Sequence, residues 1–437
     1  MSRFAALLLV VILQAGCATT EAPFQDADPS RIAREDVERV ITTLAADDMR
    51  GRQAFTDDAL RAADYLAGEF AAAGLQPLSG TEGHLQRFVV RSIATTDAQV
   101  TVNGSEVAID RVGAHLGGAS LAWATGDVNV MVVGPDDDAR PAMLAALQGD
   151  ADALLLVNEV HVDAFQRLAG FLRRPVRVVG DAPVANVVVA VVNATADATY
   201  SVTASATVAE DGLTNVVGMI PGHRTDEFVL FSAHYDHIGI RTAVDGDSIA
   251  NGANDDASGT AAVVALGKYF ASRGTPERTL LFAAFTAEEA GGYGSRHFST
   301  QLNPDQIVAM FNIEMIGTPA TEGPNTAWIT GFERSTFGSL LQEAVIGTDY
   351  TFYADPYTTQ NLFYRSDNAT LARLGVPAHS ISTTPIDVDP HYHQVTDHVE
   401  TLDLDHMTNT VRAIAMGAET MISGVATPTR VDPATVN

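Results

Sequence analysis

Three short loops between Phe228 and Glu289 concentrate side chains that can bind metals or transfer protons. The loops read HYDH, GANDDASG and TAEE, and the first and third directly follow apolar runs that are typical of strands. Histidines and carboxylates grouped at strand ends are the residue types that a hydrolytic metal site uses. Six residues of this kind in the stretch are the first candidates: His234, Asp236, Asp255, Asp256, Glu288 and Glu289.

A pair of zinc ions that hydrolyses a bond needs one carboxylate that bridges both ions, and in addition one histidine and one carboxylate for each ion. The chain offers such a set in His234, Asp255, Glu289, Glu314 and His393. Glu288 stands beside a proposed ligand, and a carboxylate facing the bound water can act as its general base. The pattern therefore predicts a hydrolytic zinc centre.

The elements around these residues alternate between strands and helices. From Asn215 onward, apolar strands are separated by helical stretches such as 258–270 and 335–345. This order predicts an α/β fold of three layers, with helices on both faces of a mixed, mainly parallel sheet. Ligands in such sheets bind at the carboxyl ends of the strands, and the predicted strand ends carry His234, Glu288, Glu289 and Glu314.

A change in the sequence pattern predicts an inserted domain. Between residues 95 and 204, short β-branched runs alternate with turns, and one Ala-rich helical piece lies at 139–147. Two helices and a strand precede this block. We expect a catalytic domain formed by 31–94 and 205–437, with 95–204 as a small β-rich insertion.

The composition and the first residues bear on partners and location. The net charge of −28 disfavours nucleic acids and anionic membrane surfaces as partners. Residues 1–17 are predicted to form a signal peptide, with a basic residue, Arg3, an apolar run at 4–13 and the only cysteine, Cys17. The segment resembles a bacterial lipoprotein signal, although Gln14 replaces the usual aliphatic residue. Residues 18–30 then form a tether. We expect an exported protein, periplasmic or at the cell surface, that meets a membrane only through a lipid on Cys17.

Six motifs in a fixed order carry a family resemblance: HYD at 234–236, GANDDASG at 252–259, FTAEEAG at 285–291, NIEMIG at 312–317, YRSDN at 364–368 and YHQVTD at 392–397. They resemble the motifs of the co-catalytic dizinc aminopeptidase family, which also includes glutamate carboxypeptidase and glutaminyl cyclase. The segment DDMRGR at 47–52 resembles a common opening of its secreted members. The block 95–204 resembles a protease-associated domain.

The resemblance implies two zinc ions bridged by Asp255. His234 and Glu314 would complete one ion, and Glu289 and His393 the other. Glu314 departs from the aspartate that many members carry. In many members a histidine follows the Ser-Asp motif, whereas this chain has Asn368.

The resemblance also implies roles around the metals. Glu288 would take a proton from water and pass it to the leaving amine. Asp236 would orient His234, Asp256 would follow the bridging residue at a position where the family has a cis peptide, and Tyr392 would stabilise the oxyanion. His237 is expected beside the ligands or at the surface, and His379 in the core.

The most direct functional prediction is an aminopeptidase that releases N-terminal residues from peptides. A carboxypeptidase or dipeptidase is an alternative, in which Arg365 would hold the carboxylate of the substrate. A glutaminyl cyclase with one zinc and a receptor-like module without activity are further alternatives. Nothing in the sequence selects a residue preference or an oligomeric state.

Overall fold

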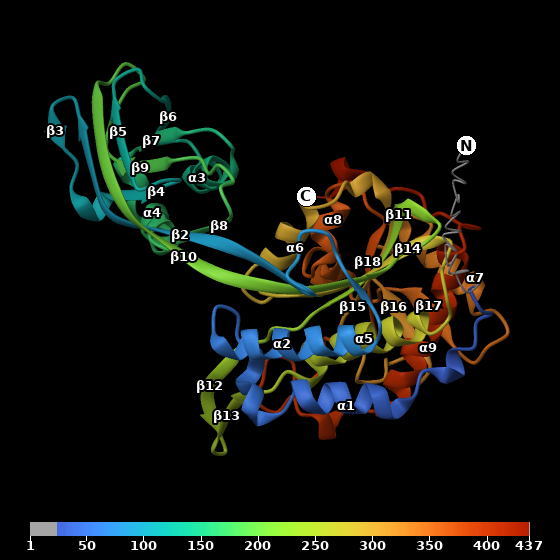
Figure 1. Ribbon diagram of the computed structural model, residues 1–437. Helices are drawn as coiled ribbons and strands as arrows, with labels where there is room; N and C mark the ends of the chain where they lie inside the picture. Colours follow the sequence, from blue (N-terminus) through green and yellow to red (C-terminus); the bar gives the residue numbers. More distant parts are fainter. Residues whose placement is uncertain (1–23, 437) are drawn as a thin grey trace, which may run out of the picture.

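Two long strands, β2 (Leu85–Val102) and β10 (Tyr200–Ile220), join the two lobes of the molecule (Figure 1). The computed structural model describes residues 24–436. The predicted signal peptide, Cys17 and the first part of the predicted tether lie outside the described residues. β2 and β10 pair antiparallel from Val102 opposite Tyr200 to Leu85 opposite Val216, so both lobes share one continuous ribbon.

The larger lobe is built on the sheet β17-β16-β18-β15-β11-β14-β10-β2. Its four central strands are parallel: β18 (Ala378–Ser382), β15 (Ile307–Ile313), β11 (Arg224–His234) and β14 (Arg278–Phe285). On one side β10 runs antiparallel to β14, and on the other β16 (Thr326–Ile329) runs antiparallel to β18 and parallel to β17 (Thr351–Ala354). The predicted mixed sheet with a parallel centre is confirmed.

Helices cover both faces of this sheet. One face packs against α1 (Arg34–Leu44), α2 (Asp57–Ala72), α5 (Ser258–Ala271), α7 (Phe337–Ala344) and α9 (Leu404–Ile422). The other face packs against α6 (Tyr293–Ser299) and α8 (Asn368–Ala372). Successive residues of a strand point to opposite faces, so Phe231 joins the first core and Leu230 the second. The α/β fold in three layers is therefore as predicted.

The smaller lobe has a sheet of its own, in the order β4-β9-β7-β6. These strands are β4 (Val112–His115), β9 (Val187–Val191), β7 (Ala153–Val157) and β6 (Asn129–Val133). One face packs on α3 (Ala139–Gln148) and α4 (Val162–Leu172), and the other on the outer part of β2 and β10 and on β5 (Ser120–Ala124). Of these two helices, only α3 was predicted from the sequence. α4 was not predicted, although its buried residues follow a helical spacing: Phe165, Ala169 and Leu172.

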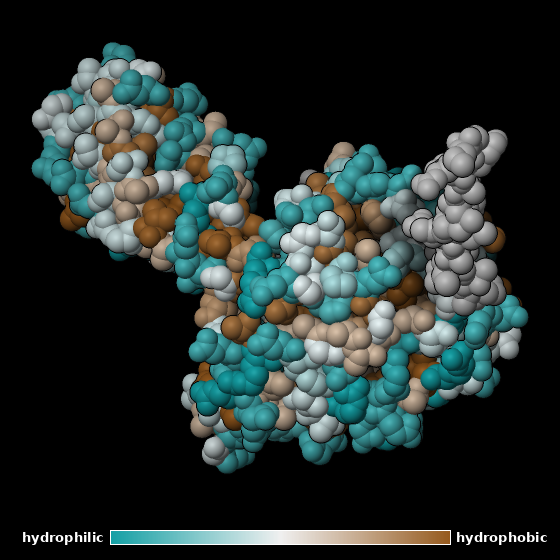
Figure 2. All heavy atoms as spheres, in the orientation of Figure 1, coloured by the Kyte–Doolittle hydropathy of each residue, from teal (hydrophilic) through white to brown (hydrophobic). Residues whose placement is uncertain are grey.

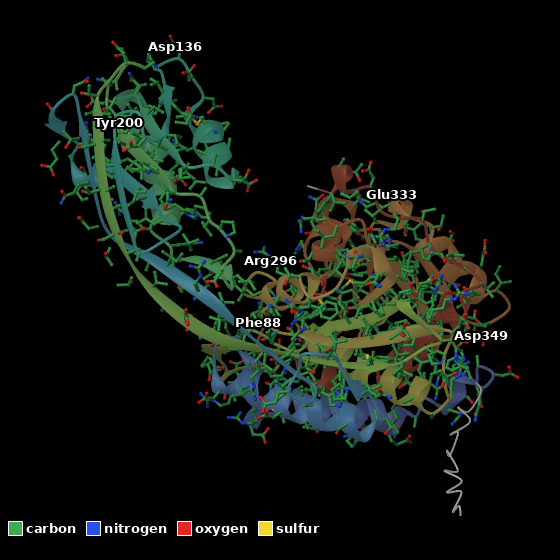
Figure 3. The ribbon with its side chains drawn as sticks, turned by 45° about the horizontal axis from the view of Figure 1, so that its top comes forward. Phe88, Asp136, Tyr200, Arg296, Glu333 and Asp349 are labelled. Atoms are coloured by element: carbon green, nitrogen blue, oxygen red, sulfur yellow. The ribbon has the colours of Figure 1, made fainter. Side chains whose placement is uncertain are left out.

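The boundaries predicted for the insertion fall inside strands, because β2 and β10 run without interruption through residues 94–95 and 204–205. Figure 2 shows a narrow connection between the lobes, and Figure 3 places Phe88 and Arg296 near it and Asp136 at the far tip of the smaller lobe. The division into a catalytic domain and an inserted domain stays a prediction.

The described part of the predicted tether packs on the end of α5. The Gln25 amide donates to the carbonyl of Arg273 at 2.7 Å, and the Asp28 amide donates to the hydroxyl of Tyr269 at 3.0 Å. Residues 24–28 are thus part of the folded lobe. Within residues 24–436, no helix is long and apolar enough to cross a membrane.

Candidate active site

Three neighbouring parallel strands deliver the predicted site residues to one edge of the sheet. β11 ends at His234, which lies opposite Phe285 at the end of β14, and Glu314 follows the end of β15. Because parallel strands end at the same edge, the loops after them meet there. Glu288 and Glu289 lie in the loop after β14, and a fourth segment, Ala253–Ala257, brings Asp255 from the start of α5.

The segment that carries Asp255 is tightly fixed by its own neighbours. The Asp255–Asp256 peptide bond is cis, as the family resemblance implied. The Asp256 carboxylate accepts from the amides of Gly259 at 2.9 Å and Met315 at 3.1 Å, which ties α5 to the loop after β15. Gly259 has no room for a side chain, since a Cβ there would lie 2.0 Å from the carbonyl oxygen of Ile313. Asp256 therefore anchors the loop.

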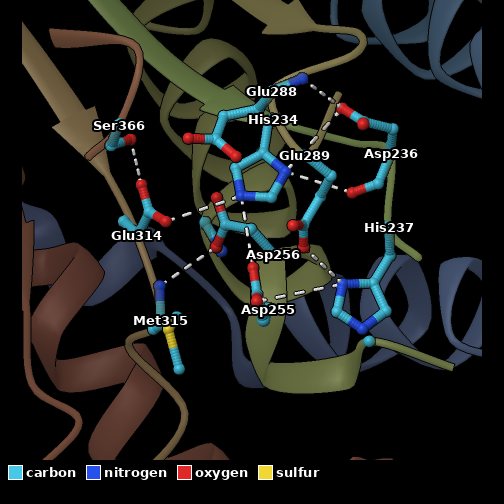
Figure 4. Close-up of polar contacts among 12 residues, drawn as sticks. His234, Asp236, His237, Asp255, Asp256, Glu288, Glu289, Glu314, Met315 and Ser366 are labelled. Carbon is cyan, nitrogen blue, oxygen red and sulfur yellow. Dashed lines mark hydrogen bonds and ion pairs between the residues drawn. The ribbon is translucent and has the colours of Figure 1, made fainter. Parts of the chain in front are cut away.

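Asp255 presents its two carboxylate oxygens to two separate clusters (Figure 4). Oδ1 lies 3.2 Å from Nε2 of His234, and the same nitrogen lies 3.5 Å from Oε1 of Glu314. Oδ2 lies 3.1 Å from Nε2 of His393, which is also 3.1 Å from Oε1 of Glu289. The structure thus brings together all five residues that the sequence offered as metal ligands.

A second histidine, not predicted as a ligand, lies in the cluster of Glu289. His237 is fully buried, and its Nδ1 lies 3.0 Å from Oε1 of Glu289 and 3.9 Å from Oδ2 of Asp255. The sequence signal was its place two residues after Tyr235 in HYDH, which could not distinguish a ligand from a surface residue.

Asp236 contacts His234 in a different way from the one predicted. Nδ1 of His234 lies 3.0 Å from the main-chain carbonyl of Asp236 and 3.8 Å from its carboxylate. The carboxylate instead accepts from the amide of Glu288 at 3.0 Å. Asp236 therefore connects the loop after β11 to the loop that carries Glu288.

Glu288 lies beside the His234 ring (Figure 4). Burial raises the pKa of its carboxyl well above the usual range, and the charges of Glu314, Asp367 and Glu289 add to this rise. Burial acts in the same direction on the pKa of Asp255, but the adjacent imidazoles of His234 and His393 hold that pKa well below the usual range. The site therefore contains one carboxyl that retains a proton more readily than its neighbour.

Tyr392 and Arg365 line a pocket beside Glu314. Tyr392 stacks on His393, with ring centroids 4.0 Å apart, and its hydroxyl accepts from Nη2 of Arg365 at 3.1 Å. The pocket has apolar side chains and hydroxyls in its wall: Met315, Trp328, Leu362, Ile386, Ser366, Ser380 and Thr384. This lining offers both apolar contact and hydrogen-bonding groups to a ligand.

Three supporting residues were missed as part of the site. Ser366 donates to Oε2 of Glu314, and Asp397 accepts from the amides of Asn254 at 2.8 Å and Asp255 at 3.1 Å. The buried guanidinium of Arg52 donates to four carbonyl oxygens, those of Leu44, Tyr235, Asn251 and Gly252. All three stand inside quoted motifs, but their partners lie up to 200 residues away along the chain.

The donor set fits metal ions. Within the described residues, Nε2 of His234, both ring nitrogens of His237 and Oε1 of Glu289 are buried without a hydrogen bond. Buried polar atoms of this kind almost always have a partner. Their types, imidazole nitrogen and carboxylate oxygen, are those that zinc binds, and their mutual distances suit a shared ion.

Residues 215–418 match peptidase family M28. This part of the chain belongs to that family. The resemblance predicted from the six motifs is therefore confirmed.

Two curated relatives are named as leucine aminopeptidases. A probable leucine aminopeptidase of Trichophyton verrucosum is 29% identical over 46% of this chain and 55% of its own length. Leucine aminopeptidase 1 of Trichophyton rubrum is 27% identical over 46% of this chain and 56% of its own length. The chain spans about half the length of these curated M28 relatives.

Two solved structures share the fold. The aminopeptidase from Aneurinibacillus sp. strain AM-1 superposes with a TM-score of 0.53, at 17% identity over 94% of this chain and 97% of that chain. BSAP, a zinc aminopeptidase from Bacillus subtilis, gives a TM-score of 0.53, at 16% identity over 92% of this chain and 97% of that chain.

Proposed function

We propose that this protein is a zinc-dependent aminopeptidase that binds two metal ions. The observation that carries the proposal is the position of Asp255, whose two carboxylate oxygens face two different groups of histidine and carboxylate atoms. His234 and Glu314 would hold one ion with Asp255, and Glu289 and His393 the other. The names of the M28 relatives support the same activity.

When bound, the ions would supply the positive charge that activates a water and polarises the scissile carbonyl. Glu288, beside the cluster of His234, would accept the proton of the water and transfer it to the leaving amine. The Tyr392 hydroxyl would donate to the developing oxyanion, and Arg365 fixes that hydroxyl.

The pocket beside Glu314 would take the first side chain of the peptide. Met315, Trp328 and Leu362 supply apolar contact, and the hydroxyls among them supply polar contact. We therefore expect activity on peptides with an apolar or small polar first residue.

Replacement of Glu288 by glutamine tests this function. We expect the zinc content of Glu288→Gln to equal that of the unaltered protein, while kcat falls by about 100-fold or more, because the amide cannot accept the proton. The measurements are metal analysis and hydrolysis of aminoacyl-nitroanilides. Glu343→Gln, which changes an exposed glutamate of α7, is the matched control and should keep full activity. Near-full activity in Glu288→Gln would refute the assignment of the base.

A carboxypeptidase is the second candidate, because Arg365 lies in the wall of the same pocket. N-acetylated peptides distinguish the two activities, since an aminopeptidase needs a free amine and a carboxypeptidase needs a free carboxylate. A glutaminyl cyclase would bind one zinc ion per chain, so the metal stoichiometry separates it from both. The predicted export and lipid anchor at Cys17 remain part of the proposal and rest on residues 1–17 alone.

A further inference from the structure

His237 is buried directly beside the carboxylates of the second cluster, and its ring nitrogens have no hydrogen-bond partner among the described residues. It is 0% exposed. His379 is equally buried, but its Nδ1 contacts the carbonyl of Thr330 at 2.8 Å and its Nε2 contacts the hydroxyl of Ser335 at 2.7 Å. Hydrogen bonding accounts for the burial of His379 and leaves the burial of His237 unexplained.

The nearest atoms to Nδ1 of His237 are carboxylate oxygens that already belong to the metal cluster. Oε1 of Glu289 is 3.0 Å away, yet both atoms lack hydrogen-bond geometry. Two polar atoms at this distance that do not point at each other can point at a common third atom. Nε2 of His234 has the same character, since it lies 3.2 Å from Asp255 without a hydrogen bond.

The distances agree with ligands around one ion. Zinc binds nitrogen and oxygen at about 2.0 to 2.2 Å, so two ligands of a tetrahedral ion lie about 3.3 to 3.6 Å apart. Nδ1 of His237 lies 3.0 Å from Glu289 and 3.9 Å from Asp255, and Nε2 of His393 lies 3.1 Å from each of the same two carboxylates. All four distances lie within about 0.3 Å of that range, so both imidazoles are close to ligand spacing from the same pair of oxygens.

The ring of His237 is held in this position by the surrounding backbone. Gly252 packs directly on it, because a Cβ on Gly252 would lie 2.5 Å from Cγ of His237. The His237 amide also donates to the carbonyl of Arg52 at 3.4 Å. A ligand that is fixed before the ion arrives loses little conformational freedom on binding.

We infer that His237 is a fourth protein ligand of the second metal ion, together with Asp255, Glu289 and His393. This inference rests on the dinuclear centre of the proposed function. The second ion would then have two imidazoles, whereas the first has one, that of His234. Imidazole is a strong ligand for zinc, so the second site should bind zinc more tightly and fill first.

Zinc titration in competition with a coloured chelator tests the inference. The unaltered protein should bind two ions in two separate steps, and His237→Ala should weaken the tighter step by about 100-fold or more. The matched control is His406→Ala, which removes another buried histidine whose ring nitrogens have no hydrogen bond in the described chain. Among the described residues His406 forms no ion pair with a carboxylate, so this control should keep both steps.

X-ray absorption at the zinc edge of the unaltered protein gives a second measurement that does not depend on a variant. Three imidazoles shared between two ions support the inference, and two imidazoles overturn it. Unchanged affinity of His237→Ala for both ions would also overturn it while leaving the dinuclear centre intact. Binding of fewer than two ions by the unaltered protein would refute the dinuclear centre itself and the inference with it.

Discussion

The histidines of this protein differ in function because their surroundings differ. His379, in β18, touches one carbonyl and one hydroxyl, which match the one donor and one acceptor of a neutral imidazole. His393 is crowded by Asp255 and Glu289: burial lowers its pKa, but the hydrogen bonds to these carboxylates prevail and raise it to about 10. The same residue type is therefore kept neutral in one place, whereas in the metal-free site it is drawn toward positive charge.

The neutral state of His379 predicts a dependence of stability on pH. Burial lowers its pKa to about 4 in the folded chain, against about 6.5 in the unfolded chain. Below about pH 6.5 the His379 side chain binds a proton in the unfolded chain but not in the folded chain. The stabilisation is therefore complete above about pH 6.5 and is lost as the pH falls toward 4, by about 3 kcal/mol.

Urea unfolding of the metal-free protein at neutral and acid pH measures this loss. His379→Gln should lose less stability on acidification than the unaltered protein, since glutamine does not titrate. His391→Gln, at a partly exposed histidine, should lose as much as the unaltered protein. An identical pH dependence in His379→Gln and the unaltered protein would show that His379 does not cause it.

At the scale of elements, the loop before α5 is held by one residue from the N-terminal part of the chain and one from the C-terminal part. Arg52, which follows α1, donates to the carbonyls of Asn251 and Gly252, and Asp397, which precedes α9, accepts from the amides of Asn254 and Asp255. The strand β11 joins the same arrangement, since Nε of Arg52 donates to the carbonyl of Tyr235 at 2.6 Å. One guanidinium thus fixes the strand end and the loop that carry His234 and Asp255.

Arg52→Lys tests this arrangement. An ammonium group lacks the planar set of five donors, so buried carbonyls would lose their partners, at about 1 to 3 kcal/mol each. We expect a loss of about 3 kcal/mol in the free energy of unfolding and weaker zinc binding, measured by urea unfolding and chelator competition. Arg39→Lys is the control, because Arg39 pairs with Glu69 at the surface and should cost less than about 1 kcal/mol. Equal small losses in both variants would contradict the role of Arg52.

At the scale of the whole molecule, the two lobes have separate hydrophobic cores. The larger lobe packs its core around β11, β14 and β15, and the smaller lobe around β7 and β9. They meet at a small cluster that includes Phe88, Tyr293 and Ala287, and the guanidinium of Arg177 lies 4.7 Å from the ring centre of Phe55 there. The contact links the smaller lobe to the loop that carries Glu288.

Separate cores predict two thermal transitions. Removal of zinc by a chelator should lower only the transition of the larger lobe, because a ligand stabilises the unit that binds it. Leu154→Ala, in the fully buried strand β7, should lower only the other transition, at a cost of about 2 to 5 kcal/mol. Scanning calorimetry measures both. A single transition that moves as a whole in both experiments would contradict the independence of the lobes.

The sequence by itself determined the family, the fold class and the five proposed metal ligands, Asp255 and the four residues around it. Those features have local signatures, because apolar periodicity marks the strands and the motifs lie at the strand ends. His234, for example, is the last residue of β11. α3 was visible for the same reason. α4 was missed although its spacing is helical. The boundaries predicted at 94–95 and 204–205 lie inside strands, because β2 and β10 each continue from the larger lobe into the smaller lobe without a break.

Only the tertiary structure decided which buried atoms face each other. His237 and His393 are 156 positions apart in the chain, and nothing in their local sequence indicates that both approach Glu289. The same holds for Arg52, whose carbonyl partners come from three separate segments, and for Asp236, whose carboxylate turns to Glu288. The physical reason is that a hydrogen bond or a metal ligand depends on distances of a few ångström, and these are fixed only when distant loops pack together.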